Sequence, residues 1–374
     1  MKMKKLLLKI VLLASFTSNV VGKFEGQEVS IEIDYENNIY PSVIMTAMNF
    51  KREHSRLIGL DPNNFIGSVN SPITIRISDT ARLNTNSVRI VVDESIINNR
   101  TEKTYRISDK KSFFIKPDLN YKYSIFTQLK QLQFIDLTIS VFDNNELLQR
   151  KRIRSHLHSI NACPYWMNQV GKMHWTWLGF VNENHPILDT ILLEGKKRRF
   201  KKEARDYKGY QGTEQDVYEQ VFNIWLALAR KGVSYSSINT SIPLQAKSVK
   251  VQHVRFPNES YLNEQANCVD GSVLIASLLT KIDIKSVLVH VPGHMYLCFT
   301  TNLETNNFNC LETTLISQSR LLTQGKKGFD AAIKAGNARY IEDYKYIKAG
   351  YQDYALIDIA KLRNELQIVP IPMD

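Results

Sequence analysis

Three short segments in the second half of the chain place a thiol, an imidazole and a carboxylate at marked points of the expected secondary structure. They are Asn267-Cys268-Val269-Asp270, Pro292-Gly293-His294 and Leu311-Glu312-Thr313-Thr314. The first opens an apolar run, the second follows a strand-like run, and the third lies in a later strand-like run. A thiol, an imidazole and an acid in this order are the parts of a cysteine nucleophile system. The pattern predicts a helix and two strands that meet at one site.

The residues after Asn267 predict a buried helix. Residues 272–280 are mostly apolar or small, Asn267 is a favourable N-cap residue, and Asp270 stands where a capping box has its acid. Cys268 then lies in the first helical turn, where free backbone N–H groups and the helix dipole favour a thiolate. The alternative is a buried cysteine that only fills space beside the cap.

Strands are expected after this helix, over residues 285–291, 294–300 and 308–315. The first is rich in β-branched side chains, and Pro292-Gly293 ends it. The polar stretch 301–307 has the length and content of a hairpin loop.

If the strands on either side of that loop pair antiparallel, His294 and Glu312 lie on one face of the sheet. Glu312 then holds one ring nitrogen of His294 and leaves the other for Cys268. The alternative is that His294 is an ordinary hydrogen-bonding residue at a strand start, without a catalytic role.

The region from Gln252 to Thr314 resembles the transglutaminase-like superfamily, most closely its bacterial branch. The residues that carry the resemblance are Val254-Arg255-Phe256-Pro257, Asn267-Cys268-Val269-Asp270, Val291-Pro292-Gly293-His294 and Leu311-Glu312-Thr313-Thr314. An amphipathic stretch over residues 217–228, followed by Gly232-Val233-Ser234-Tyr235, extends it, so that it covers about residues 185–320. The resemblance implies an α+β, papain-like core in which a helix bearing the cysteine packs on an antiparallel sheet bearing the histidine and the acid.

One position departs from the family pattern. The family most often has Asp as its third residue, whereas this chain has Glu312, whose side chain is longer by one methylene. The site also needs a donor for an oxyanion, and the Cys268 backbone N–H is the natural first one. The family usually adds an upstream side chain, for which Gln252 is our candidate, with Gln265 and Trp225 as alternatives. Gln252 can equally be an ordinary polar strand residue.

The N-terminus has the features of a signal peptide over residues 1–22. Met1 to Lys5 is basic, residues 6–16 are apolar except for Lys9, and Val20-Val21-Gly22 offers small residues before a cut ahead of Lys23. The apolar run is too short to span a membrane. We therefore expect an exported protein, periplasmic or secreted, with uncleaved N-terminal anchoring as the alternative. No integral membrane span is expected after cleavage.

Residues 23–158 have a different pattern, with short alternating runs at residues 29–33, 73–77, 88–92 and 135–141. Polar turns separate these runs at even spacing, which is typical of an all-β sandwich domain. Residues 159–184 are expected to connect it to the transglutaminase-like domain at 185–374. His156 and His158 lack further ligands, so we expect no metal there, and no residue pattern implies a cofactor.

The chain is basic without being extreme, and its motifs argue against a nucleic-acid partner. The net charge is +11, and four lysines (Lys2, Lys4, Lys5, Lys9) lie in the signal peptide, which leaves 11 − 4 = +7. The densest basic run, residues 196–202, is typical of a solvated loop or linker; the alternative is contact with an anionic envelope polymer. No zinc-finger spacing, phosphate-binding glycine loop or RNA-stacking motif is present, so nucleic acid is not an expected partner.

The remaining cysteines and the C-terminal region complete the expectations. Cys298 and Cys310 lie on the two paired strands with the facing parity that permits a disulfide; free buried thiols are the alternative for both and for Cys163. Residues 329–336 are expected to form a helix that ends at Gly336. Residues 354–359 are expected to form a strand followed by a short helix.

Together these features predict an exported enzyme that transfers acyl groups from amides, a peptidase or amidase and, if an amine replaces water, a transamidase. Its expected substrate is a protein or peptide, for which a component of the cell envelope is one candidate. Cys268 would be the nucleophile, His294 the proton carrier and Glu312 the orienting acid. The competing hypothesis is a catalytically idle protein that keeps the fold for binding or assembly in the envelope. The residue pattern does not determine the oligomeric state.

Overall fold

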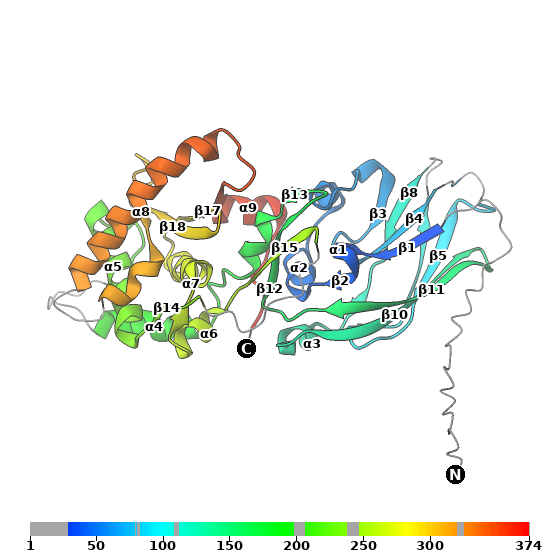
Figure 1. Cartoon of the computed structure of the whole chain (residues 1–374), viewed down its shortest axis with the longest axis horizontal. Coiled ribbons are helices and arrows are strands. Elements are labelled where there is room, and N and C mark those ends of the chain that lie inside the picture. Colours follow the sequence, from blue (N-terminus) through cyan, green and yellow to red (C-terminus); the bar gives the residue numbers. More distant parts are fainter. Residues whose placement is uncertain are drawn as a thin grey trace, which may run out of the picture.

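The structure is a computed structural model that describes residues 29–78, 80, 83–107, 112–197, 206–237, 247–319 and 325–373. The predicted signal peptide, residues 1–22, and most of the basic run at 196–202 lie outside these ranges. The fold is mixed α and β with several sheets. The molecule is elongated, with the N-terminal sheets at one end and a helix-covered sheet at the other (Figure 1). In the described ranges no helix combines the length and the apolar character needed to cross a membrane.

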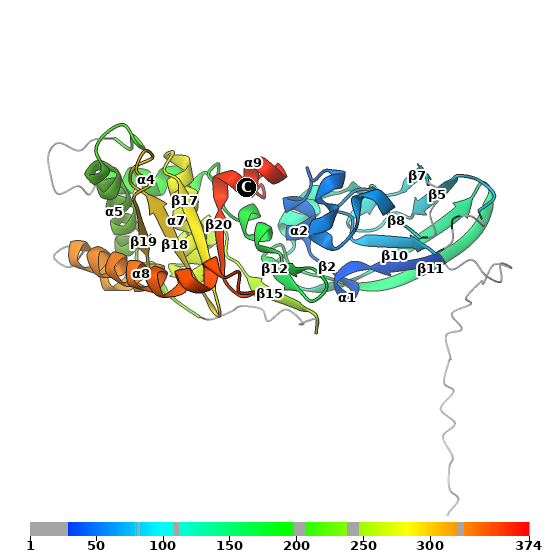
Figure 2. The ribbon, with the colours of Figure 1, turned by 90° about the horizontal axis from the view of Figure 1, so that it is seen from above.

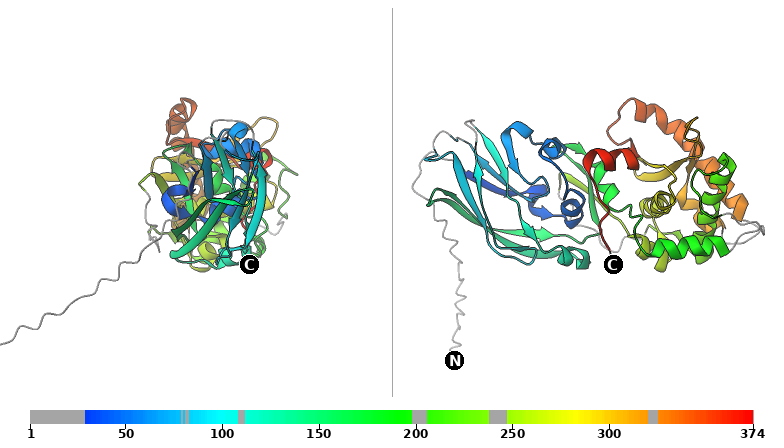
Figure 3. Two further views of the ribbon diagram at one scale, coloured as in Figure 1. Left: turned by 90° about the vertical axis from the view of Figure 1, so that its right-hand side faces the viewer. Right: turned by 180° about the vertical axis from the view of Figure 1, so that it is seen from behind.

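Two sheets make up the N-terminal end (Figure 3). The first has the order β1-β4-β8-β3, formed by Val29–Ile33, Ile73–Ile77, Phe113–Lys116 and Phe65–Gly67. The second has the order β2-β11-β10-β5-β7, formed by Asn38–Ile39, Glu146–Leu157, Gln133–Asp143, Ser87–Val92 and Thr101–Arg106. Short helices α1 (Asp34–Asn37), α2 (Pro41–Thr46) and α3 (Tyr123–Gln128), and the short β6–β9 pair (Asn98–Asn99 with Asn120–Tyr121), lie in their connections.

Alternation of apolar and polar residues explains these strands. Along β4 the isoleucines 73, 75 and 77 are buried, while Thr74 and Arg76 lie on the other face. Ile75 of the first sheet and Ile139 of the second belong to the same buried cluster, which continues into the C-terminal end through residues such as Leu288. The four alternating runs expected from the sequence are confirmed as β1, β4, β5 and β10.

A small sheet lies between the two ends of the molecule and joins distant parts of the chain. Its order is β13-β12-β15, formed by Gly171–Lys172, Ala162–Met167 and Val249–His253. The short 3-10 helix η4 (His174–Gly179) follows β13, and its Trp177 is buried. Residues 159–184, expected to be a connection, therefore contribute a strand that pairs with β15 from the C-terminal part of the chain.

The C-terminal end is built around a sheet of order β19-β18-β17-β20 (Figure 2), formed by Phe308–Leu311, His294–Thr300, Ser286–Val291 and Ala355–Asp358. Helix α7 (Cys268–Lys281) packs against β17 and β18, where Leu288, Leu297 and Phe299 are buried in the main core. Helix α8 (Gly325–Lys348) runs along β19. The other elements of this end are α4 (Ile187–Lys197), α5 (Glu214–Lys231), α6 (Pro257–Leu262), α9 (Ile359–Leu366) and the parallel pair β14 (Ser234–Tyr235) with β16 (Gln265–Ala266).

The expected hairpin is present, and of the two alternatives for Cys298 and Cys310 the structure has the disulfide. Strands β18 and β19 pair antiparallel, and the Thr301 N–H donates to the Asn307 carbonyl at 2.7 Å to close the loop. Cys298 and Cys310 are direct partners in this register, and a disulfide joins them. The strand and helix expected around residues 354–359 are β20 and α9.

Two expectations about element ends are wrong. The strand expected over 308–315 stops at Leu311, because a 3-10 helix, η5 (Thr313–Ser319), begins two residues later. The helix expected to end at Gly336 runs on to Lys348. Gly336 instead allows close packing, since a Cβ atom there would lie 2.4 Å from the Cys310 carbonyl oxygen.

Candidate active site

The N-terminus of α7 is capped as the sequence predicts. The Asn267 side-chain oxygen accepts hydrogen bonds from the N–H groups of Val269 (2.8 Å) and Asp270 (2.9 Å). The Asp270 carboxylate accepts in return from the Asn267 N–H at 3.0 Å, which completes a capping box. Cys268 is therefore the first residue of a helix whose N-terminus is capped, and the Cys268 residue is half-buried.

A buried ion pair anchors this cap to the segment before it. Asp270 has no exposed surface, and its carboxylate accepts from the Arg255 N–H at 2.8 Å and from the Arg255 guanidinium at 2.7 Å. Burial raises the pKa of Asp270, although its bonds to Arg255 and Asn267 act in the opposite direction. Loss of Arg255 would leave an unpaired carboxylate under the helix start, which is strongly unfavourable.

His294 opens β18, and its Nε2 lies 2.8 Å from Oε2 of Glu312. The His294 side chain is 15% exposed and the Glu312 side chain 8%, so water screens this pair weakly. The Cys268 thiol also acts on this imidazole, in the direction that raises the pKa of His294. Because Glu312 occupies Nε2, Nδ1 is the nitrogen left for the thiol. The three side chains expected to meet are thus brought together.

The electrostatics of the pair favour a charged imidazole. Burial by itself lowers the pKa of His294, but the hydrogen bonds and charges of Cys268 and Glu312 outweigh it and raise that pKa to about 9. Burial similarly works to raise the pKa of Glu312, yet its bonds with His294 and Thr314 hold it below the usual value. At neutral pH His294 therefore carries a proton and Glu312 a negative charge.

Glu312 has donors on both of its carboxylate oxygens. Oε1 accepts from the Thr314 hydroxyl at 2.7 Å and from the Thr314 N–H at 3.3 Å. Oε2, which faces His294, also accepts from Nη1 of Arg339 on α8 at 3.3 Å. Thr314 therefore folds back onto the Glu312 carboxylate just after β19 ends at Leu311.

The first turn of α7 also offers a backbone donor. The N–H groups of Val269 and Asp270 bind the Asn267 side chain, and the Gly271 N–H donates to the Asn267 carbonyl at 3.0 Å. The Cys268 N–H has no acceptor among the residues that the structure describes. It is thus placed to donate to an oxyanion that forms next to the sulfur.

The three candidates for a second oxyanion donor occupy different surroundings. Gln252 lies on β15, half-buried, and its amide nitrogen donates to the neighbouring His253 carbonyl at 3.0 Å. Gln265 lies on β16, three residues before Cys268 and half-buried. Trp225 is completely buried in α5, and its ring packs near Phe329. In the part of the chain that the structure describes, the Gln252 amide thus bonds to its own neighbour and not to Cys268 or His294.

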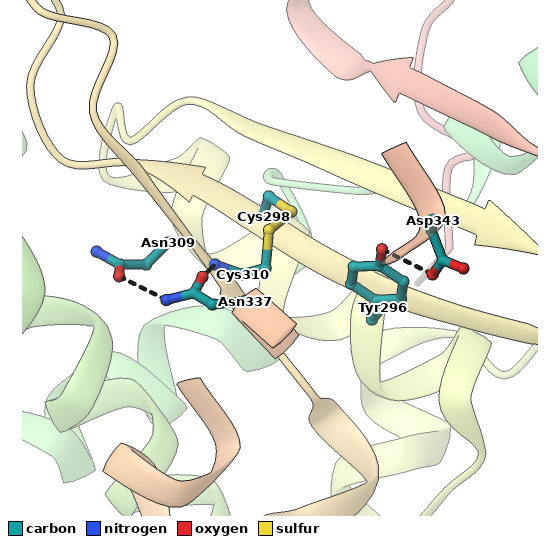
Figure 4. The surroundings of a disulfide bond; sticks show 6 residues. All are labelled: Tyr296, Cys298, Asn309, Cys310, Asn337 and Asp343. Atoms are coloured by element: carbon teal, nitrogen blue, oxygen red, sulfur yellow. Dashed lines mark hydrogen bonds between the residues drawn. A yellow bond between two sulfur atoms is a disulfide. The ribbon is translucent and has the colours of Figure 1, made fainter. Parts of the chain in front are cut away.

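The other cysteines have no part in this site. Cys163 is completely buried, and burial raises its pKa to about 12 despite a hydrogen bond with Thr176 that lowers it. The Cys298–Cys310 disulfide links β18 to β19 (Figure 4), and Cys310 lies two residues before Glu312 in the chain. Asn337 of α8 lies beside it and accepts from the Cys310 N–H at 2.7 Å.

His156 and His158 are engaged within the N-terminal sheets. His158 is buried, with Nε2 2.7 Å from Oδ1 of Asn38, and its ring stacks on Tyr40. His156 lies against the ring of Phe134. In the part of the chain that the structure describes, no group of three or more His, Cys, Asp or Glu side chains is arranged to hold a metal ion.

Comparison with known proteins adds no assignment, since no family model matches the chain and no curated protein matches it. The site must therefore be judged from its own geometry. Sequence reasoning missed the roles of Arg255, Thr314 and Arg339. Arg255 and Thr314 lie within the motifs quoted above, so the motifs themselves were a signal that could have found them. No local sequence pattern distinguishes Arg339 from the other residues of its helix.

Proposed function

We propose that this protein is an exported cysteine-dependent acyl-transfer enzyme that acts on amide bonds of proteins or peptides. The observation that carries the proposal is the position of His294 between the Cys268 thiol and the Glu312 carboxylate. A space-filling cysteine would need neither a basic partner nor a buried acid behind that partner. This argues against the catalytically idle alternative.

The arrangement of elements favours the architecture expected from the family resemblance. The two N-terminal sheets contribute residues to the same buried cluster, as the sheets of a β-sandwich do. Helix α7, which begins with Cys268, packs on an antiparallel sheet that carries His294, as in a papain-like or transglutaminase-like domain. These features support the proposed division into a β-sandwich domain and a transglutaminase-like domain.

In the proposed reaction the Cys268 sulfur attacks the carbonyl carbon of the substrate amide. The carbonyl oxygen becomes negatively charged and accepts a hydrogen bond from the Cys268 N–H. His294, protonated and held by Glu312, then donates its proton to the leaving nitrogen as the C–N bond breaks. The products of this half-reaction are a free amine and a thioester between the acyl group and Cys268.

The second half-reaction releases the acyl group. His294, now neutral, removes a proton from the attacking water while the oxygen bonds to the acyl carbon and the C–S bond breaks. The leaving thiolate and the reprotonated imidazole restore the starting state. An amine in place of water would give transamidation by the same steps. We favour hydrolysis, because water is always present and no feature of the described residues marks an amine site.

Export is part of the proposal, and the disulfide supports it. A disulfide persists in oxidising compartments such as the periplasm and the extracellular space, but is rare in the cytosol. The basic and apolar residues at the N-terminus independently favour export.

The test uses thiol alkylation, which needs no known substrate. The native protein is treated with iodoacetamide at pH 6, and the labelled cysteines are identified by mass spectrometry. Cys268 should react much faster than a small thiol such as glutathione, because its partner imidazole is charged there. Cys163 serves as an internal control that should stay unlabelled, since it is completely buried.

The same protein is then incubated with a peptide library, with and without dansylcadaverine, a fluorescent primary amine. A thioester on wild type that is absent from Cys268→Ala supports the enzyme; incorporated dansylcadaverine identifies transamidation, and free acid identifies hydrolysis. A Cys268 that reacts no faster than glutathione and forms no thioester would overturn the proposal and favour an idle site.

A further inference from the structure

Helix α8 docks on the edge strand that leads to Glu312. The Ala332 carbonyl accepts from the Glu312 N–H at 3.1 Å, and Asn337 accepts from the Cys310 N–H at 2.7 Å. Between them Gly336 has no Cβ, which lets the helix backbone approach the Cys310 carbonyl. These residues lie on one helical face, so α8 satisfies N–H groups that an edge strand otherwise exposes.

Arg339 lies on the same face, one turn beyond Gly336, and extends this docking to the Glu312 side chain. Its Nη1 donates to Oε2 of Glu312 at 3.3 Å, and its Nε lies 3.8 Å from the Asp343 carboxylate. Asp343 in turn accepts from the Tyr296 hydroxyl at 3.1 Å. Tyr296 is on β18, two residues after His294, so Arg339 belongs to a network anchored on the strand of the histidine.

The length of Glu312 explains why such a contact matters. Glutamate has one more rotatable bond than the aspartate that is usual at this position in the family it resembles, and hence more ways to turn away from His294. Thr314 fixes one carboxylate oxygen at 2.7 Å, and Arg339 contacts the oxygen that faces the imidazole. The Arg339 side chain is 42% exposed while that of Glu312 is 8% exposed, so the arginine covers the pair from the solvent side.

We propose that Arg339 is a positioning residue, which holds Oε2 of Glu312 against Nε2 of His294 and so compensates for the longer acid. This inference rests on the proposed function of Cys268, His294 and Glu312, and it assigns α8 a part in that site. Arg339 would act through Glu312 alone and need not touch the substrate.

The direction in which the pKa of His294 changes when Arg339 is removed distinguishes a positioning role from a purely electrostatic one. If Arg339 acted only as a nearby positive charge, its removal would favour the charged imidazole and raise the pKa of His294. If Arg339 positions Glu312, its removal lets the carboxylate turn away and lowers the pKa of His294. A purely structural role would leave this pKa unchanged in the folded protein.

The experiment compares full-length wild type with Arg339→Gln, Arg339→Lys and a matched control, Lys334→Gln. Lys334 is exposed on the same helix, so its substitution removes the same charge without a recorded contact to Glu312. The pKa of His294 is followed by NMR of histidine-labelled protein, with the signal assigned by His294→Asn. Thermal unfolding confirms that each variant is folded.

In Arg339→Gln the pKa of His294 should fall by about 1 or more, and Cys268 alkylation at pH 8 should slow by about twofold or more. Arg339→Lys should restore part of both values, and Lys334→Gln should match wild type. A rise or no change in Arg339→Gln overturns the positioning role. Failure of the proposed function is seen separately, as an unreactive wild-type Cys268, whereas failure of this inference appears as a His294 pKa in Arg339→Gln that equals or exceeds that of wild type.

Discussion

The proton on His294 is controlled by the two side chains that contact its ring. Cys268 and Glu312 act in the same direction, and together they overcome the effect of burial, which would otherwise favour the neutral ring. Glu312 can do this because His294, Thr314 and Arg339 all donate to it, so its charge persists although it is nearly buried. At the scale of single residues, the site is a set of mutually stabilising charges.

The first prediction concerns the charge of Glu312. Glu312→Gln keeps a hydrogen-bonding group of the same size but loses the charge that stabilises the imidazolium. The pKa of His294 should fall from about 9 toward its ordinary value. If it falls by about 2, the protonated fraction at pH 8 drops by roughly tenfold. Cys268 alkylation at pH 8, measured by mass spectrometry, should slow accordingly, and Glu312→Ala should slow it at least as much.

Glu342→Gln is the control for this prediction, because Glu342 is an exposed acid on α8 and its substitution removes the same charge. Its alkylation rate should equal that of wild type. Equal rates in Glu312→Gln and Glu342→Gln, with both proteins folded, would show that Glu312 is not the third member of the site.

At the scale of elements, the site depends on how β18 and β19 are held together. Backbone pairing, the Cys298–Cys310 disulfide and the docking of α8 act on the same short stretch of β19. The stretch needs this support because β19 is short and lies at the edge of its sheet. Glu312 follows directly after it, so its position is set by these contacts.

The second prediction concerns that disulfide. The cysteines are 12 residues apart, and closing a loop of this length reduces the entropy of the unfolded chain by an amount worth about 3 kcal/mol. The double variant Cys298→Ala/Cys310→Ala should therefore be less stable by about 3 kcal/mol, measured by urea unfolding. Dithiothreitol should destabilise wild type to a similar extent and leave the double variant unaffected. An unchanged urea midpoint in the double variant would contradict this.

At the scale of the whole molecule, the segment between the two ends brings a group of aromatic rings against the C-terminal sheet. Trp177 and Tyr165 stack, and both lie near His290 of β17, which also packs near His174. Burial lowers the pKa of His290 to about 4, with Asp353 opposing this and Lys250 and Lys172 adding to it. For His174, burial and then His290 and Lys172 lower the pKa to about 3.

The third prediction is a loss of stability in acid that arises at this junction. The unfolded chain binds a proton at each histidine near pH 6.5, whereas the folded chain does so only near pH 3 to 4. Folding is therefore opposed as pH falls from 6.5 toward 4, by about 1.4 kcal/mol per pH unit for each histidine. His290→Phe should reduce the slope of unfolding free energy against pH in this range, measured by urea unfolding. Above pH 7 both proteins should show the same slope, and equal slopes below pH 6 would refute the assignment.

Much of the secondary structure follows from local sequence. The start of α7, the alternating strands of the N-terminal sheets and the hairpin of β18 and β19 were all predictable, because caps, β-branched alternation and polar turns act over a few residues. The approach of Glu312 to His294 was predicted on the condition that the two strands pair, although Glu312 itself lies one residue beyond the end of β19.

The sequence by itself thus determined the helix start at Cys268 and the hairpin of β18 and β19 that follows His294. Only the tertiary structure decided that β12 pairs with β15, that Gly336 lies within α8, and that Arg339 reaches Glu312. These features depend on segments distant in the chain, where no periodicity relates one residue to its partner. From the sequence alone, a glycine after a helical run predicts the end of the helix. Its close contact with a neighbouring strand is seen only in the tertiary structure.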